Sequence, residues 1–186
     1  MVVTIDGPAA SGKGTLARML AEHLQVPHLD TGLLYRYVAE RVLAAGGSPN
    51  DPEAALAAAR GIDLAALDRE RLSRSELGEA ASRVAAMPAV RAALLKLQQD
   101  FARQPGGAVL DGRDAGTVIA PEAEVKIFVT ASPEVRAGRR HRELAVRGEN
   151  LTYDQVLADI RRRDERDSGR AAAPLKPAPD AVLLDT

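Results

Sequence analysis

The stretch Gly7-Pro8-Ala9-Ala10-Ser11-Gly12-Lys13-Gly14-Thr15 decides the fold of this chain. It follows the β-branched run 2–5 and opens the helix-forming run 16–24. Strand, glycine loop and helix are the context of a phosphate-binding loop, in which backbone N–H groups and a helix N-terminus surround an anion. Lys13 is placed to reach the outer phosphates. The sequence therefore predicts that residues 7–15 bind a nucleoside triphosphate.

The hydroxyl that usually follows the lysine of such a loop is displaced by one position. Gly14 stands there and Thr15 comes next. A threonine hydroxyl is a suitable Mg²⁺ ligand, so Thr15 is the expected metal contact of a bound Mg²⁺ and ATP pair. The alternative is a glycine-rich turn before an ordinary helix, which the flanking strand and helix disfavour.

Composition restricts the class of protein. A chain of 186 residues suits one α/β domain with room for an insertion. The absence of cysteine excludes disulfides and thiolate chemistry, and no apolar run or leader-like start points to a membrane, so a cytoplasmic protein is expected. His23, His28 and His141 show no metal-like pairing and are interpreted as solvated or packing residues.

The charged residues favour small anions over nucleic acid. The net charge of −1 argues against a general nucleic-acid surface. Only four of the 25 Lys and Arg residues are lysines, so the cationic chemistry is mostly that of guanidinium, whose planar fork matches phosphate oxygens. The run 161–170 is rich in arginine, but acids interrupt it and no aromatic residue interleaves, which fits phosphate clamps better than a nucleic-acid patch.

Strands and helices alternate along the chain. We predict strands at 2–6, 26–30, 108–111, 125–129 and 181–184, with helices at 14–24, 132–147 and from Thr152, whose sequence has the form of a capping box. This pattern indicates a doubly wound parallel sheet of the α/β class. The block 31–104 is almost wholly helical in pattern and too long for one crossover helix, so it is interpreted as an inserted subdomain.

Two sets of polar residues follow predicted strands. Asp111 ends an apolar strand, and its carboxylate should stand at the carboxyl edge of the sheet, where Mg²⁺ would bind it directly or through water. Asp30 and Thr31 likewise follow a strand and open a helix, and Tyr35 and Arg36 lie in its first turns. A helix N-terminus beside a guanidinium predicts a second anion site.

Four motifs in this order resemble the bacterial cytidylate kinases. They are Ile5-Asp6-Gly7-Pro8 with Gly12-Lys13-Gly14-Thr15, Leu29-Asp30-Thr31-Gly32 with Tyr35-Arg36, Asp111-Gly112-Arg113-Asp114 with Gly116-Thr117, and Arg163-Asp164-Glu165-Arg166-Asp167 with Arg170. The resemblance covers the whole chain. It implies one kinase domain over 1–186 of the P-loop NTPase type, with a core (1–30, 105–135 and 164–186), a helical monophosphate-binding flap (31–104) and a short lid (136–163).

The resemblance also implies roles for individual residues. Lys13, Arg113 and Arg163 would be the catalytic cations. Ser82, Arg91 and Asp114 resemble the residues that read the cytosine edge; Arg36 and Arg113, with Thr31 and Tyr35, those that hold the acceptor phosphate; Asp167 and Arg170, those that touch the sugar. Arg136 and Arg140 resemble lid arginines that meet ATP. The implied reaction is ATP-dependent phosphorylation of CMP and dCMP by a monomer acting on free nucleotides.

The sequence departs from the family pattern in two places. The segment 61–75 is too short for the strand-rich stretch that many members carry in the flap, which suggests looser base selectivity. The chain ends at Thr186 without the closing helix of the pattern, so a truncation, or another surface over that face of the sheet, is expected. Another P-loop small-molecule or nucleoside monophosphate kinase is the nearest rival, and a nucleotide-dependent switch is a second, although no Asn-Lys-x-Asp guanine motif is present.

Overall fold

A five-stranded, all-parallel sheet forms the core of the computed structural model, which describes residues 1–186. The strands are β1 (Val2–Asp6), β2 (His28–Asp30), β3 (Ala108–Gly112), β4 (Val125–Thr130) and β5 (Val182–Asp185). Their order in the sheet is β2-β3-β1-β4-β5, so β1 lies at the centre between β3 and β4. The carboxyl ends of β1, β2 and β3 therefore meet at one edge, where open α/β sheets bind ligands.

Side chains of β1 alternate between the two faces of the sheet. Val3 and Ile5 pack with Ala17 and Ala21 of helix α1 (Lys13–Leu24) on one face. Thr4 and Asp6 point to the other face, toward η2 (Ala115–Ile119), a single π-helical turn that follows β3. The two faces thus carry helix α1 on one side and the start of η2 on the other.

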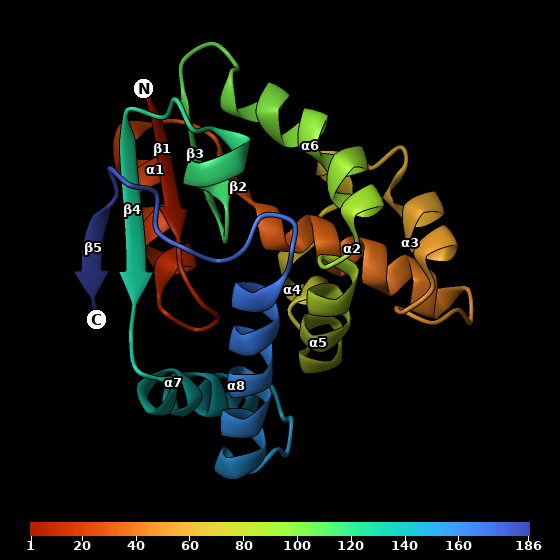
Figure 1. The fold of residues 1–186 in the computed structure, drawn as a ribbon. Coiled ribbons are helices and arrows are strands. Elements are labelled where there is room, and N and C mark those ends of the chain that lie inside the picture. Colours follow the sequence, from red (N-terminus) through yellow and green to blue (C-terminus); the bar gives the residue numbers. More distant parts are fainter.

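All elements of the flap segment (31–104) are helices, which agrees with its predicted, almost wholly helical pattern. It contains α2 (Thr31–Ala44), α3 (Pro52–Ala59), η1 (Leu64–Ala66), α4 (Arg69–Leu72), α5 (Ser75–Val84) and α6 (Pro88–Ala102). These helices form a body beside the sheet, with α2 running outward from the end of β2 (Figure 1). Their own core of 14 buried residues includes Leu34, Val38, Val84 and Leu94, so this body is held by packing of its own.

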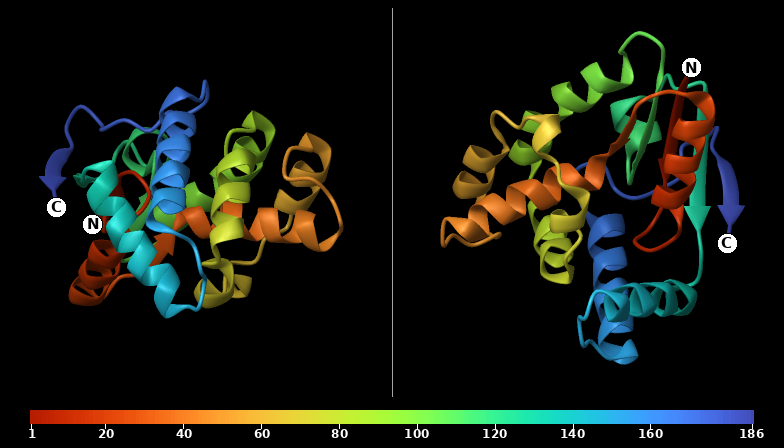
Figure 2. Two further views of the ribbon diagram at one scale, coloured as in Figure 1. Left: turned by 90° about the horizontal axis from the view of Figure 1, so that it is seen from below. Right: turned by 180° about the vertical axis from the view of Figure 1, so that it is seen from behind.

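Helices α7 (Pro133–Val146) and α8 (Tyr153–Gly169) cross each other below the sheet, and α8 lies beside α5 of the flap (Figure 2). Both helices start as expected: Ser132 caps α7, and Thr152 and Gln155 form the complete capping box of α8. Ala137, Leu144, Val156 and Ile160 pack between them. Because α8 runs without a break from the predicted lid into the predicted core, the two segments share one continuous helix.

The observed elements differ from the sequence-based expectation mainly at their ends. The predicted strand 26–30 is wrong at its start, because Gln25 closes α1 in a left-handed conformation and β2 begins only at His28. Strands β3 and β4 each extend one residue further than predicted, and β5 lies one residue later. No strand is present in 61–75, where η1 and α4 lie.

The surface offers no membrane-spanning element. None of the helices combines the length and the apolar character that crossing a bilayer requires.

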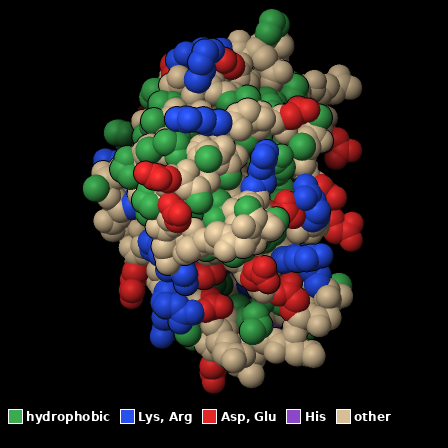
Figure 3. All heavy atoms as spheres, turned by 90° about the vertical axis from the view of Figure 1, so that its right-hand side faces the viewer, with side chains coloured by type: hydrophobic (Ala, Val, Ile, Leu, Met, Phe, Trp, Pro, Cys, Tyr) green, Lys and Arg blue, Asp and Glu red, His purple; other side chains and the backbone are tan.

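The outer face of the molecule on the flap side shows Lys and Arg interspersed with Asp and Glu (Figure 3). This face therefore has no patch of a single sign of charge.

Arg136 joins α7, α8 and the phosphate loop. Its guanidinium donates to both carboxylate oxygens of Asp164, at 3.1 and 2.6 Å, to Ala131 O at 2.8 Å and to Ala9 O at 3.3 Å. The residue is buried. Its N–H donors thus hold α7, α8 and the phosphate loop together.

Replacing Arg136 with alanine should lower the free energy of unfolding by about 2–4 kcal/mol, because Asp164 and two carbonyls lose their partner. Urea unfolding followed by circular dichroism measures the change. The matched control is Arg161→Ala, which removes an exposed α8 to α7 pair with Glu134 and should cost about 0–1 kcal/mol. Equal losses in the two variants would contradict the structural role of Arg136.

Candidate functional site

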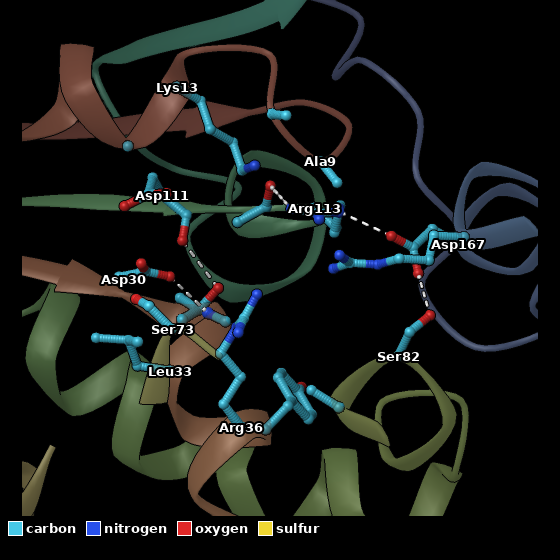
Figure 4. Close-up of a pocket in the computed structure, with 18 of the residues that line it drawn as sticks. Ala9, Lys13, Asp30, Leu33, Arg36, Ser73, Ser82, Asp111, Arg113 and Asp167 are labelled. Carbon is cyan, nitrogen blue, oxygen red and sulfur yellow. Dashed lines mark hydrogen bonds and ion pairs between the residues drawn. The ribbon is translucent and has the colours of Figure 1, made fainter. Parts of the chain in front are cut away.

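A cavity of about 520 Å³ lies between the sheet edge, the flap and α7 with α8. The phosphate loop, the ends of β2 and β3, the start of α2, and α5, α6, α7 and α8 all contribute residues to its wall. Lys13, Asp30, Arg36, Asp111, Arg113 and Asp167 converge on it (Figure 4). It is the one place where the predicted triphosphate and acceptor sites meet.

The phosphate loop is shaped for an anion. A Cβ on Gly7 would lie 2.1 Å from Val129 O, and Gly12 has a φ of +91°, so both positions require glycine. Helix α1 begins at Lys13 with no side-chain cap, which leaves its first N–H groups available to a ligand. Lys13 Nζ donates to Pro8 O at 3.1 Å. Burial, with Arg113 close by, lowers the pKa of Lys13 to about 7.

Two carboxylates lie side by side at the ends of β2 and β3. Asp30 and Asp111 are register partners, and Thr31 Oγ1 donates to Asp111 O at 2.9 Å. Burial and the neighbouring Asp111 raise the pKa of Asp30 above its usual value. Asp111 Oδ2 lies toward Gly14, where an added Cβ would be 3.6 Å from it. A carboxylate oxygen beside the phosphate loop is therefore available to a hard cation.

His28 does not line the cavity but contacts Asp111, which does. Its Nε2 lies 2.6 Å from Asp111 Oδ1, and the histidine side chain is 14% exposed. The interpretation of His28 as a solvated or packing residue did not include this contact, although the period of two along β2 puts His28 and Asp30 on the same face of the strand.

Three arginines from different elements gather near Lys13. Arg113 donates from Nε to Asp167 Oδ2 at 2.8 Å, and Asp167 raises its pKa against the opposing effect of burial. Burial and the nearby arginines lower the pKa of Arg36 to about 9 and that of Arg163 to about 10. Arg163 Nε is buried without a hydrogen-bond partner. These cations repel one another, and a bound anion would relieve that repulsion.

Backbone carbonyls of residues 72–74 hold arginines from α2 and α7. Arg36 Nη1 donates to Leu72 O at 2.8 Å and to Arg74 O at 3.1 Å. Ser73 O accepts from Arg140 Nη2 at 3.3 Å and from Arg147 Nη1 at 2.7 Å. The same turn thus contacts guanidinium groups of both the flap and the lid segment.

A second polar cluster lines the far end of the cavity. Asp114 is paired with Arg91, and Arg170 Nη2 lies 3.6 Å from its other oxygen. The Arg91 guanidinium also stands 5.5 Å from the centroid of the Tyr35 ring. These groups provide a ring face, a carboxylate and guanidinium donors within one buried wall.

Asp167 connects the two ends of the cavity. Its Oδ1 accepts from Ser82 Oγ at 3.2 Å, and its Oδ2 accepts from Arg113. Burial acts to raise the pKa of Asp167, but Arg113 and Arg163 outweigh this effect. The pKa of Asp167 therefore lies below its usual value. Asp167 is therefore a charged carboxylate that holds Arg113 in place.

The structure brings most of the predicted site residues to the cavity wall, but not all of them. The wall includes Ala9, Ala10, Gly12, Lys13, Gly14, Thr15, Thr31, Tyr35, Arg36, Ser82, Arg91, Asp111, Arg113, Asp114, Arg140, Arg163, Asp167 and Arg170. Gly7, Pro8 and Ser11 shape the loop from behind the wall, and their roles toward a ligand stay predictions.

Arg136 does not line the cavity, and its guanidinium pairs with Asp164. This geometry does not support the prediction that Arg136 contacts ATP. In its place, Arg139 lines the cavity and donates to Ser11 O at 3.4 Å. Arg18, Arg69 and Arg147 also line it and were not predicted. Spacing along a helix did not reveal which arginines face inward, because Asp164, the partner that turns Arg136 away, is distant in sequence.

Comparison with known proteins agrees with the fold and the motifs. A family model described as cytidylate kinase matches residues 3–186. The chain is 69% identical over 186 residues to the cytidylate kinase of Xanthobacter autotrophicus, covering all of this chain and 89% of that protein. It is 62% identical over 186 residues to that of Methylocella silvestris, covering 86% of the latter.

A solved structure of an uncharacterized protein from Eubacterium ventriosum resembles this chain in fold, with a TM-score of 0.54 at 14% identity, over all of this chain and 88% of that one. The match over nearly the whole chain, the high identity to the curated relatives and the order of the motifs around one cavity lead to one conclusion: the chain belongs to the cytidylate kinase family.

Proposed function

We infer that the protein catalyses the reversible transfer of the γ-phosphoryl group from ATP to CMP and dCMP, which yields ADP and CDP or dCDP. The observation that carries this inference is the cavity, in which a phosphate loop with Lys13 faces Arg36, Arg113 and Arg163. Two anions can therefore be held face to face. Membership of the family makes the acceptor a cytidine monophosphate. Another P-loop kinase activity is not favoured by a match of this extent.

The acceptor oxygen needs no base from the protein. The second pKa of a phosphate monoester is about 6, so near neutral pH the acceptor is already ionised. Catalysis then consists of aligning two phosphates and stabilising the charge that spreads over the transferred group. We propose that Lys13, Arg113 and Arg163, which line the cavity, perform that task.

The oxygen donors beside the phosphate loop fit a magnesium ion. Thr15 Oγ1 is a hard ligand at the cavity wall, and Asp111 presents Oδ2 while its Oδ1 faces His28. We propose that these groups, directly or through water, hold the Mg²⁺ that accompanies ATP and that would neutralise charge on the phosphates when bound.

The far cluster fits the acceptor nucleoside. We propose that Asp114 accepts a hydrogen bond from the cytosine amino group and that Arg91 and Ser82 lie at the edge of the base. Arg170 Nη2 is buried without a hydrogen-bond partner, which leaves a donor for the nucleoside. Arg36, with Thr31 and Tyr35, would hold the acceptor phosphate, and Arg140 would meet the ATP phosphates. A cytoplasmic monomer acting on free nucleotides stays a prediction.

A panel of acceptors tests this function. ADP release measured with CMP, dCMP, UMP and AMP should be fastest with the two cytidine nucleotides. Lys13→Ala should lower turnover at least about a hundredfold without unfolding the protein, since one lost cation at a transferred phosphoryl group costs a few kcal/mol. A preference for AMP, or near-normal turnover in the folded variant, would refute the proposal.

The lowered pKa of Lys13 predicts proton uptake when ATP binds. At about pH 8 most Lys13 amines are neutral before binding, and the triphosphate should restore their charge, so about one proton is taken up; at about pH 6 the amine is already charged and contributes none. Calorimetry in buffers of different ionisation enthalpy measures the uptake. Lys13→Arg, which is always charged, is the control, and equal uptake by both proteins at the higher pH would contradict the shift.

Asp167→Asn should impair both cytidine substrates. The loss of a charge-assisted bond to Arg113 weakens phosphate alignment, so kcat should fall about tenfold to a hundredfold with CMP and with dCMP, as about 1.5–3 kcal/mol implies. Ser82→Ala removes the other partner of Asp167 and should act more weakly. A variant that changes only the ratio of the two substrates, with kcat retained for one of them, would restrict Asp167 to contact with the sugar.

A further inference from the structure

The loop that follows β3 carries two side chains that serve opposite ends of the cavity. Arg113 reaches Asp167 and the phosphate region, whereas Asp114 pairs with Arg91 at the far cluster. Because these residues are adjacent, the path of one short piece of backbone sets the position of both. Whatever fixes residues 112–116 therefore controls the acceptor site.

A buried carboxylate at the end of β1 holds that backbone. Asp6 Oδ1 accepts from Ala115 N and Asp6 Oδ2 accepts from Gly116 N, each at 2.8 Å. Asp6 is 4% exposed and does not line the cavity. Burial raises the pKa of Asp6 to about 6, although the two N–H groups act in the opposite direction. Each carboxylate oxygen thus has its own backbone donor.

The packing around residues 112–116 leaves little space for the backbone to move. A Cβ on Gly116 would lie 2.7 Å from Thr4 Oγ1, and one on Gly112 would lie 2.3 Å from Thr31 Oγ1. Gly7 N also donates to Gly112 O at 3.3 Å. The loop therefore packs tightly against β1, and the hydrogen bonds that Asp6 accepts determine the orientation of the loop there.

We propose that Asp6 is a positioning residue for the acceptor nucleotide: by binding the N–H groups of residues 115 and 116, it sets the places of Arg113 and Asp114. This role rests on the proposed function of the cavity. Asp6 itself contacts no substrate.

Asp6→Asn tests the role with almost no change of volume. The amide keeps one acceptor and turns an NH₂ group toward the second N–H, so one backbone donor loses its partner in either orientation. We expect kcat/KM for CMP to fall at least about tenfold, the preference for CMP over UMP to fall at least about fivefold, and KM for ATP to stay within about twofold.

A second readout does not depend on activity. Amide hydrogen exchange in a peptide covering 113–117 should be faster in Asp6→Asn than in the parent protein, while a peptide covering α3 should be unchanged. If Asp6→Asn does not accumulate as folded protein, Asp6→Ser, which keeps a single acceptor, is measured in the same way.

Two control variants separate positioning from loss of stability. Ile5→Val weakens the same strand through its opposite face, in the cluster with Ala17 and Val109. Asp51→Asn repeats the chemistry at the start of α3, where Asp51 accepts from Glu53 N and Ala54 N. Both controls should lower the melting temperature and leave the preference for CMP over UMP unchanged.

The outcomes are distinct. A folded Asp6 variant with the parent's exchange in 113–117, or with the parent's preference for CMP over UMP, overturns the proposal. The same shift of preference in Ile5→Val would also overturn it, since general loosening of β1 would then suffice. Failure of the parent protein to phosphorylate CMP would refute the proposed function instead, and the exchange measurement would still decide whether Asp6 seats the loop.

Discussion

The site depends on the cost of holding several cations close together in a partly buried cavity. Arg36, Arg113 and Arg163 lie near Lys13, and Asp167 is the carboxylate that pairs directly with Arg113. Burial first, and then this repulsion, lowers the pKa values of Lys13, Arg36 and Arg163. The surrounding fold keeps these cations in place through packing within the flap and between α7 and α8. Two bound phosphates would therefore relieve the repulsion between the cations.

Closure of the cavity uses polar contacts between segments distant in sequence. Arg166 on α8 donates to Glu79 on α5 at 2.9 and 3.3 Å, and Ser75 donates to Glu149. These pairs are partly exposed, and each contributes little to stability alone. They join the flap to α8 and to the loop between α7 and α8, with contacts that can break without disturbing either hydrophobic cluster. Such an arrangement suits a cavity that must open to exchange nucleotides.

Local chemistry made much of the fold predictable. The strand and helix that flank the glycine loop, the helix starts at Ser132 and Thr152, and the apolar strand at Asp111 were predicted from neighbouring residues, and the structure confirms these elements. The contacts that depend on distant partners were not predictable. Arg136 turns toward Asp164, and His28 meets Asp111 across 83 positions. Resemblance to a family supplied candidate residues, but only the tertiary structure shows which side chain reaches which wall.

The turn at residues 72–74 has a consequence for how the chain tolerates change. It holds Arg36, Arg140 and Arg147 through main-chain oxygens, and its side chains take no part in those bonds. A substitution at Ser73 or Arg74 that preserves the turn leaves these bonds intact, so the contact is not encoded in the identity of those residues. The acceptors in the turn are neutral, and an arginine leaves a carbonyl for a phosphate at lower cost than it leaves a carboxylate. Arg140 and Arg147 also pair with Glu143, each at 2.8 Å, whereas Arg36 has its side-chain hydrogen bonds to the turn alone. The turn can therefore keep the guanidinium group of Arg36 ordered and still release it to an incoming nucleotide.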